Sequence, residues 1–251
     1  MINMILLISH ILADFYFQTN QIVKGKYKGV RWIFIHCMIH FGVMLIVTGS
    51  VIDSGEYRRL LFACVSICVV HGVIDSIKCK ILKRDQNSKY RPMLFLLDQA
   101  LHVITILIGS TVFDLKLDEN NGILQSVFSF ALTQEVLVIL LAVLICWRPA
   151  SYFVAEVFSV VSRKSQNGDS TEDNEIRIGS WIGILEREII LLLGLMHQFG
   201  AIGLVLAAKS LARYKQLEDK EFAERYLVGT LISTLVAILA VVMCQYFKVA
   251  N

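Results

Sequence analysis

Proline, charged residues and paired cysteines are all scarce in this sequence. Only 2 of the 251 residues are proline and only 18% are charged, whereas 56% are hydrophobic; an average soluble domain is about 45–50% apolar. The charges are grouped between apolar runs, as expected where the runs lie in lipid and the charges in water. The composition excludes an ordinary soluble domain and predicts a polytopic membrane protein.

The absence of cysteine pairs and of concentrated basic charge excludes two further classes. The 6 cysteines lie within apolar segments or at their ends and form no CxxC pair, which predicts small buried side chains and neither a disulfide framework nor a thiolate metal site. The formal net charge is +3, and no basic run is interleaved with aromatic residues, so we expect no nucleic-acid partner. A membrane lipid is the expected partner of the basic loops.

Seven apolar segments predict an all-α fold, a polytopic membrane helix bundle of about seven transmembrane helices. A span needs about 20 apolar residues, so the first segment is short unless it extends to residue 23. The expected spans are residues 2–17, 32–52, 60–82, 92–113, 123–147, 181–208 and 227–247.

The spans and the polar stretches between them divide the chain into four regions. The first is a four-helix membrane bundle, and the second is a fifth span followed, after Arg148-Pro149, by a short interfacial helix. A polar linker comes next, and then a two-span region with an amphipathic helix at 209–225. In order, the four regions are residues 1–113, 114–162, 163–179 and 180–251.

Four pairs of polar residues interrupt the first four apolar segments. The members of each pair are four residues apart, which places both side chains on one face of a helix. An aspartate at the centre of a membrane helix costs about 2.5–3.5 kcal/mol on insertion scales, so three of them on adjacent helices require compensation. The pairs are His10 with Asp14, His36 with His40, His71 with Asp75, and Asp98 with His102.

The distribution of basic residues predicts the orientation of these helices. The connectors after the first and third segments are rich in lysine and arginine, and such loops lie mainly on the cytoplasmic side. The N-terminus is then outside, and all four pairs lie at a similar depth in the cytoplasmic half of the bilayer. Residues 209–225 do not fit, because strict alternation places them outside although they include five basic residues.

Three interpretations of the polar pairs compete. Hydrogen bonding between helices explains a single pair, at about 0.6–2 kcal/mol, but requires no common depth. A proton or ion pathway uses the same residue types but should spread them along the membrane normal. A metal site explains both the spacing and the shared depth, because each helix then offers two ligands to one ion. We therefore favour a buried metal site.

The four pairs supply more ligands than one ion needs. Imidazole and carboxylate are ligands of zinc, manganese and iron, and one such ion takes about four or five of them. One or two divalent ions fit: two a few Å apart, or one with aspartates that orient its histidines, would use every group. The expected metal ligands are His10, Asp14, His36, His40, His71, Asp75, Asp98 and His102.

Hydrolysis and redox chemistry are both compatible with such a site. In hydrolysis the ion acidifies a bound water and a spare aspartate accepts its proton, so the candidate catalytic residues are Asp14, Asp75 and Asp98. A di-iron centre in a four-helix bundle is the redox alternative. The basic loops at the same membrane face could hold a phosphate-bearing lipid, or could only set the topology.

A few polar residues outside the pairs are weaker candidates. Gln18 continues the polar stripe of the first pair by one turn, whereas Gln99 points about 100° away from Asp98 and is expected to make a core or helix contact. In the second half of the chain, Arg187 is expected to pair with one of the glutamates beside it. His197 lacks an acidic partner four residues away, and we expect a satisfied interior histidine.

Six short motifs along the chain carry a family resemblance. They are HILADFYFQ from His10, HGVID from His71, DQALH from Asp98, GSWIGILER from Gly179, AKSLAR from Ala208 and ERYLVGT from Glu224. With these residues the chain resembles the DUF3307 family of bacterial integral membrane proteins over nearly its whole length. The resemblance implies a bacterial inner-membrane protein and supplies no reaction. In ligand type alone, the arrangement is also similar to membrane-bound metal-dependent hydrolases.

These observations lead to one expected function and two alternatives. We expect a multi-pass membrane protein that is a metal-dependent hydrolase of a lipid or lipid-linked phosphate. The first alternative is a transporter or channel that uses the same pairs for ions or protons. The second is a non-catalytic scaffold whose second half, with its 163–179 linker, docks a cytosolic partner. A homo-oligomer is compatible with each of the three.

Overall fold

The computed structural model describes residues 1–85, 89–116, 133–161 and 172–247. All regular secondary structure in these ranges is helical, which confirms the all-α prediction. The chain forms two compact units, Met1–Leu137 (unit 1) and Val138–Asn251 (unit 2).

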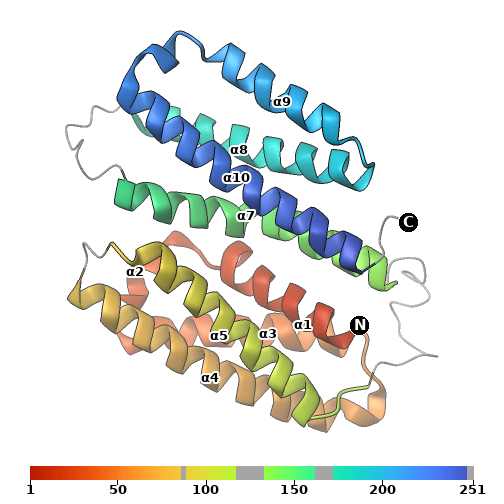
Figure 1. Ribbon diagram of the computed structural model, residues 1–251. Coiled ribbons are helices and arrows are strands. Elements are labelled where there is room, and N and C mark those ends of the chain that lie inside the picture. The colour runs from red at the N-terminus through yellow and green to blue at the C-terminus, as the bar shows by residue number, and fades with distance from the viewer. Residues whose placement is uncertain (86–88, 117–132, 162–171, 248–251) are drawn as a thin grey trace. The chain divides into compact units, whose positions relative to one another are not determined.

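Unit 1 is a bundle of helices, coloured red to yellow-green in Figure 1. Its elements are α1 (Ile2–Ile11), the π-helical turn η1 (Leu12–Tyr16), α2 (Asn20–Lys26), α3 (Val30–Gly49), the 3-10 turn η2 (Ser54–Glu56), α4 (Tyr57–Arg84) and α5 (Arg91–Val112). Helix α3 packs against α1, α2 and α4, and α5 packs against α1 and α4. The helices that carry the four polar pairs are therefore neighbours in one bundle.

The first apolar segment is sharply bent. The side chain of Thr19 accepts a hydrogen bond from the backbone N–H of Ile22 at 3.4 Å and so caps the start of α2. Helix α2 is turned by 88° from the preceding helix, Ile2–Tyr16. That preceding helix is about 22 Å long, shorter than a hydrocarbon core of about 30 Å. The segment therefore does not cross a bilayer as one straight helix.

The helices of unit 1 bury their polar pairs and expose aliphatic side chains. Leu6, Met44 and Leu60 are fully buried in its apolar core. In contrast, Ile46 is 74% exposed, and many other large aliphatic side chains are exposed along α3, α4 and α5. Large exposed apolar surfaces of this kind are typical of helices that face lipid.

The described residues of unit 2 form three long helices and one shorter helix. The elements of the unit are α7 (Gln134–Val161), which starts just before the unit boundary, α8 (Glu172–Leu195), α9 (Phe199–Ala212), the 3-10 turn η3 (Gln216–Glu218) and α10 (Lys220–Tyr246). Helix α8 packs against α9 and α10. Residues 163–171 of the expected linker and the connector 117–122 lie outside the described residues, and α8 begins inside the range expected to be linker.

Five helices in the described residues are long and apolar enough to span a membrane: α3, α4, α5, α7 and α10. The bent pair Ile2–Tyr16 and Asn20–Lys26 raises the number to six if it is counted as one span. These helices fit a multi-pass membrane protein, and the expected total of about seven is not confirmed.

The expected span 181–208 is interrupted at residues 196–198. His197 has φ 57°, in the left-handed region, and the N–H groups of His197 and Gln198 donate to the carbonyls of Gly194 and Leu193 at 3.1 and 2.8 Å. This is the hydrogen-bond pattern of a Schellman motif, which ends a helix. His197 is exposed and not interior as expected. Helix α9, with 14 residues, is about 21 Å long.

Two other expected elements differ from the structure. The amphipathic helix expected at 209–225 is not continuous, because α9 ends at Ala212 and α10 begins at Lys220, where Asp219 caps it by accepting from the N–H of Phe222 at 2.7 Å. The break expected at Arg148-Pro149 does not occur, and α7 continues through Pro149 to Val161. The short interfacial helix expected after that break is therefore the second half of α7.

Candidate metal centre

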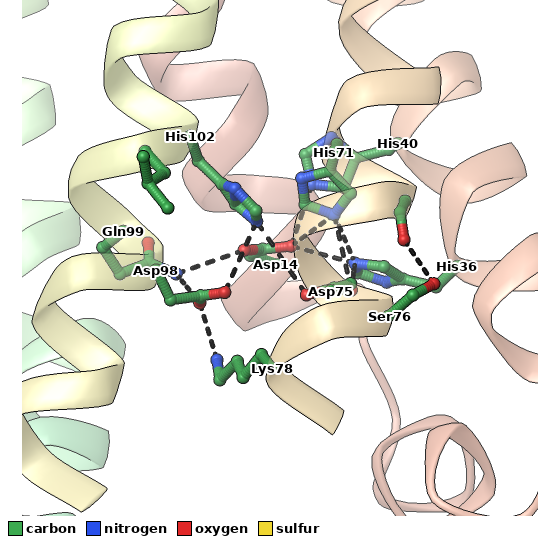
Figure 2. Close-up of polar contacts among 12 residues, drawn as sticks. Asp14, His36, His40, His71, Asp75, Ser76, Lys78, Asp98, Gln99 and His102 are labelled. Atoms are coloured by element: carbon green, nitrogen blue, oxygen red, sulfur yellow. Dashed lines mark hydrogen bonds and ion pairs between the residues drawn. The ribbon is translucent and has the colours of Figure 1, made fainter. Parts of the chain in front are cut away.

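Four helices of unit 1 each contribute two side chains to one buried cluster (Figure 2). The histidines of the cluster are at most 3% exposed, and two of its three aspartates are 4% exposed. The structure thus brings together all eight residues singled out in the sequence. They are His10 and Asp14 on α1 and η1, His36 and His40 on α3, His71 and Asp75 on α4, and Asp98 and His102 on α5.

Asp14 reaches the cluster from an irregular turn. It lies in the π-helical turn η1, where the N–H of Phe17 donates to the carbonyl of Leu12 at 2.9 Å, five residues earlier. A π turn is wider than an α turn and redirects the side chains within it; such turns are frequent at functional sites. The regular i,i+4 geometry assumed for the first pair therefore does not by itself place Asp14.

One oxygen of Asp14 is the point on which the histidines converge. Its Oδ1 atom lies 2.9 Å from Nε2 of His40, 3.0 Å from Nε2 of His36 and 3.6 Å from Nε2 of His71. Two ligands at tetrahedral angles around a zinc ion lie about 3.3 Å apart, given metal–nitrogen and metal–oxygen bonds near 2.0–2.1 Å. The contact of Asp14 with His40 is a hydrogen bond in this structure, and the three separations are also close to the spacing of ligands that share one ion.

Three overlapping groups of side chains could each hold a metal ion. Within a group, one ligand atom from each residue lies within 4.8 Å of the others. His71 belongs to the first and second groups and Asp75 to the second and third, so the groups form a continuous row with room for more than one ion. The groups are His10, Asp14, His40 and His71; His36, His71 and Asp75; and Asp75, Asp98 and His102.

Buried polar atoms without partners test whether the cluster fits an ion. Among the described residues, Nε2 of His10, Nε2 of His102 and Oδ1 of Asp98 make no hydrogen bond. Each such buried atom costs about 1–3 kcal/mol, and cations bound at the first and third ligand groups would supply the missing partners. Burial, atom type and spacing all fit a divalent ion held by nitrogen and oxygen.

Two lysines that were not singled out from the sequence also enter the cluster. Nζ of Lys26, on α2, lies 2.6 Å from Oδ2 of Asp75, and Nζ of Lys78, on α4, lies 2.6 Å from Oδ2 of Asp98. Lys78 lies three residues after Asp75 and seven after His71, on the same face of α4. Its place in the cluster could therefore have been predicted from the sequence. Lys26 reaches the cluster only because of the 88° bend before α2.

Two glutamines also contact the cluster. The Nε2 group of Gln99 donates to Oδ2 of Asp98 at 3.1 Å and lies 3.5 Å from Oδ2 of Asp14. Gln99 therefore belongs to the site, which corrects the expectation that it makes a core or helix contact. Gln18 accepts a hydrogen bond from Nζ of Lys26 at 3.3 Å and so lies at the edge of the cluster.

A comparison with known protein families gives a match that covers most of unit 1. A family model described as "Protein of unknown function (DUF3307)" matches residues 2–129. The chain belongs to the DUF3307 family. No curated protein and no solved structure matches the chain. The DUF3307 match includes every residue of the cluster and ends before unit 2, so the three motifs quoted from the second half of the chain lie outside it.

Beyond the DUF3307 match, unit 2 has a buried polar network of its own. The Arg187 side chain is 2% exposed and donates to the carbonyl of Cys146 at 2.5 Å and to the hydroxyls of Ser151 and Ser233 at 2.7 and 3.0 Å. Instead of the expected glutamate, its partners are oxygens of α7 and α10. It thereby joins three helices, because Arg187 itself lies on α8.

A second cation, which is partly buried, connects α9 to the same unit. Lys209 of α9 forms an ion pair with Glu186 of α8 and donates to the hydroxyl of Thr230 of α10 at 3.1 Å. Its Nζ also lies 5.3 Å from the centre of the Tyr226 ring. The motifs quoted from the second half of the chain therefore contain the residues that connect the helices of unit 2.

Proposed function

We propose that this protein binds one or two divalent metal ions within a membrane and uses them to hydrolyse a lipid or lipid-linked phosphate. The observation that carries the proposal is the convergence of buried histidine nitrogens on Asp14 Oδ1, with separations of 2.9–3.6 Å. In this account the chain lies in the inner membrane of a bacterium. Its cluster lies in the cytoplasmic half, beside the basic connectors.

The overlapping groups suggest how the ligands are divided. A first ion would be held by His10, Asp14, His40 and His71, a set of nitrogen and oxygen ligands that suits zinc, manganese or iron. A second ion would be held by Asp75, Asp98 and His102. When bound, a divalent ion makes water acidic enough to act as a nucleophile near neutral pH.

The aspartates then divide into two roles. Asp14 acts as a ligand, because its Oδ1 is surrounded by imidazole nitrogens. Asp75 and Asp98 could both contribute to holding a second ion, and a carboxylate oxygen of either one that is left uncoordinated would be placed to accept a proton from water. A hydrolytic role is favoured by the compactness of the cluster, since a conducting pathway would spread its titratable groups across the membrane.

One observation favours transport as a second candidate function. The segment that carries His10 and Asp14 is broken by the 88° bend, and discontinuous helices surround the ion sites of many transporters. In that alternative the same cluster binds the transported ion or proton. Ion uptake into liposomes that is abolished by Asp75→Asn, without any hydrolytic activity, would favour transport over hydrolysis.

Metal analysis and lipid hydrolysis together test the proposal. The full chain, purified in detergent, should contain about one to two equivalents of a divalent metal and release phosphate from phosphatidic acid in nanodiscs. The double variant His36→Ala/His40→Ala should lose both properties. His197→Ala is the matched control, because His197 is exposed in unit 2 and is the only histidine outside the cluster.

The metal and activity measurements have separate consequences. Less than about half an equivalent of metal in the wild type, unchanged in the double variant, would exclude the metal centre. Stoichiometric metal without release of phosphate would retain the metal centre and exclude the hydrolysis of this class of lipid.

A further inference from the structure

Lys26 on α2 and Lys78 on α4 form ion pairs with two aspartates of the cluster. Lys26 is 9% exposed and Lys78 is 26% exposed at the side chain, and each holds one carboxylate oxygen at 2.6 Å. Figure 2 shows Lys78 directed at Asp98. Long charged side chains are rarely buried without a specific partner, so both positions are built into the site.

Lys26 occupies an oxygen that a metal ion would take, whereas Lys78 holds Oδ2 of Asp98 and leaves Oδ1 without a partner. A cation on Oδ1 of Asp98 would reduce the negative charge that holds Lys78 at Oδ2. Asp75 belongs to two of the three candidate ligand groups, and Asp98 to one of them. The oxygen of Asp75 that accepts from Lys26 is also 3.5 Å from Nε2 of His36. An ion bound there would compete directly with the ammonium group, so metal binding releases the lysine from its aspartate.

The charge of the cluster changes sign when metal binds. Its three aspartates and two lysines give a net charge of −1 with neutral histidines. One divalent ion changes this value to +1, and two ions change it to +3. Buried charge is costly unless it is compensated, so an anion beside a metal-loaded site would stabilise it.

The released ammonium groups are placed to bind that anion. They are anchored at Asp75 and Asp98, whose ligand atoms lie within 4.8 Å of each other, so both flank one small region. An ammonium group has three donors, and charge-assisted hydrogen bonds to phosphate oxygens are strong. A phosphate or diphosphate group has the negative charge and the several acceptor oxygens that suit this region.

We infer that Lys26 and Lys78 form a phosphate subsite beside the metal ions, in which each lysine exchanges its aspartate for a phosphate oxygen when metal binds. This inference rests on the proposed function and adds the residues that recognise the substrate. It also sets an order of binding, in which the metal comes first and the phosphate second.

The packing of α2 holds Lys26 at this subsite. A Cβ atom at Gly25 would lie 2.3 Å from Cδ2 of Trp32, so the missing side chain lets α2 rest on the indole at the start of α3. Lys26, the next residue, also donates to Gln18 at 3.3 Å. Gln18 therefore provides a second acceptor for the ammonium group of Lys26.

Binding of inorganic phosphate to the full chain tests the inference. Protein is loaded with metal, freed of excess metal and titrated with phosphate by calorimetry. We expect phosphate to bind only to the metal-loaded form and to bind at least about tenfold more weakly to Lys26→Met and to Lys78→Met. Lys24→Met on α2 and Lys80→Met on α4 are the controls, because both lysines are exposed.

A second readout separates the subsite from simple damage to the fold. Because Lys26 competes with metal for Asp75, Lys26→Met should bind metal about tenfold more tightly while it binds phosphate more weakly. A destabilised protein would weaken both. Lys26→Arg, which keeps the charge and the donors, should retain phosphate binding within about threefold of wild type.

Nanodiscs identify the source of the phosphate group. Lysine-dependent binding is measured with free phosphate, with nanodiscs that contain phosphatidic acid and with nanodiscs that contain only phosphatidylcholine. Such binding to free phosphate or to phosphatidic acid supports the inference. Metal-loaded variants that bind phosphate as tightly as wild type, or no binding in any arm, would overturn it while leaving the metal centre intact. A wild-type protein without metal would overturn the inference and the proposed function together.

Discussion

Asp14 joins the histidines of different helices at a single carboxylate oxygen. That oxygen is 2.9 Å from Nε2 of His40 and 3.0 Å from Nε2 of His36, and the second oxygen is 3.7 Å from Nε2 of His10. Asp14 is not held by a lysine among the described residues, in contrast to the other two aspartates. No ammonium group therefore competes with a metal ion for its oxygens, and Asp14 is the aspartate most directly suited to be a ligand.

Asp14→Asn tests this role at the residue scale. The amide removes the negative charge and one of two equivalent acceptors, so we expect metal affinity to fall by at least about tenfold. Metal content after dialysis against a weak chelator measures the change. Asp114→Asn is the control, since its side chain is 76% exposed; if the Asp14→Asn variant retains metal like the control, Asp14 is not a ligand.

The sequence predicted the members of the cluster better than the contacts inside it. Side chains four residues apart share a face on any regular helix, so His36 and His40 could be placed together without a structure. Lys26 could not, because it reaches Asp75 only after an 88° bend. The prediction for Gln99 was wrong. The angle of about 100° between Asp98 and Gln99 around their helix does not show which groups a long side chain can reach.

At the scale of elements, α2 is the part of unit 1 most dependent on one residue. Gly25 lies against the indole of Trp32 with no space for a Cβ atom. Gly25→Ala should push α2 from α3 and withdraw Lys26 from Asp75. We expect a loss of about 1–3 kcal/mol in the free energy of unfolding, together with weaker binding of phosphate by the metal-loaded protein.

Gly29→Ala is the matched control for this variant. A Cβ atom at Gly29 meets nothing within 4 Å, and its φ of 177° is open to any residue. Denaturation followed by tryptophan fluorescence compares the two variants. Equal stability in Gly25→Ala and Gly29→Ala would show that the contact with Trp32 does not position α2.

Arg187 is the corresponding element-scale connector in unit 2. Its guanidinium group donates to α7 and α10 through four hydrogen bonds. Arg187→Met should remove at least about 2 kcal/mol from the free energy of unfolding, because buried carbonyl and hydroxyl oxygens lose their donor. Metal content should not change, since the cluster lies in unit 1.

Calorimetric unfolding of Arg187→Met against Lys215→Met, an exposed position, checks this prediction. A variant as stable as the control would show that the network is dispensable. The sequence placed Arg187 beside glutamates but gave no sign of its carbonyl partners, which depend on how α7 and α8 pack. Similarly, it could not show that His197, and not a glycine, would adopt the left-handed conformation that ends α8.

For the whole molecule, orientation in the membrane is the prediction that connects the cluster to the cytoplasm. Single cysteines in an otherwise cysteine-free chain report the side of each connector by reaction with a membrane-impermeant maleimide in spheroplasts. Lys24→Cys should react only after permeabilisation, and Asp53→Cys, between α3 and α4, should react without it. The reverse pattern would place the cluster in the outer half of the membrane.

The central claim, a metal centre of histidine and aspartate ligands, is tested most directly by X-ray absorption at the edge of the metal that copurifies with the full chain. The eight residues of the cluster offer only nitrogen and oxygen, and the six cysteines are free. The account predicts a first shell of about four to five nitrogen and oxygen atoms at about 2.0–2.2 Å. A shell containing sulfur at about 2.3 Å, or a protein without metal, would contradict it.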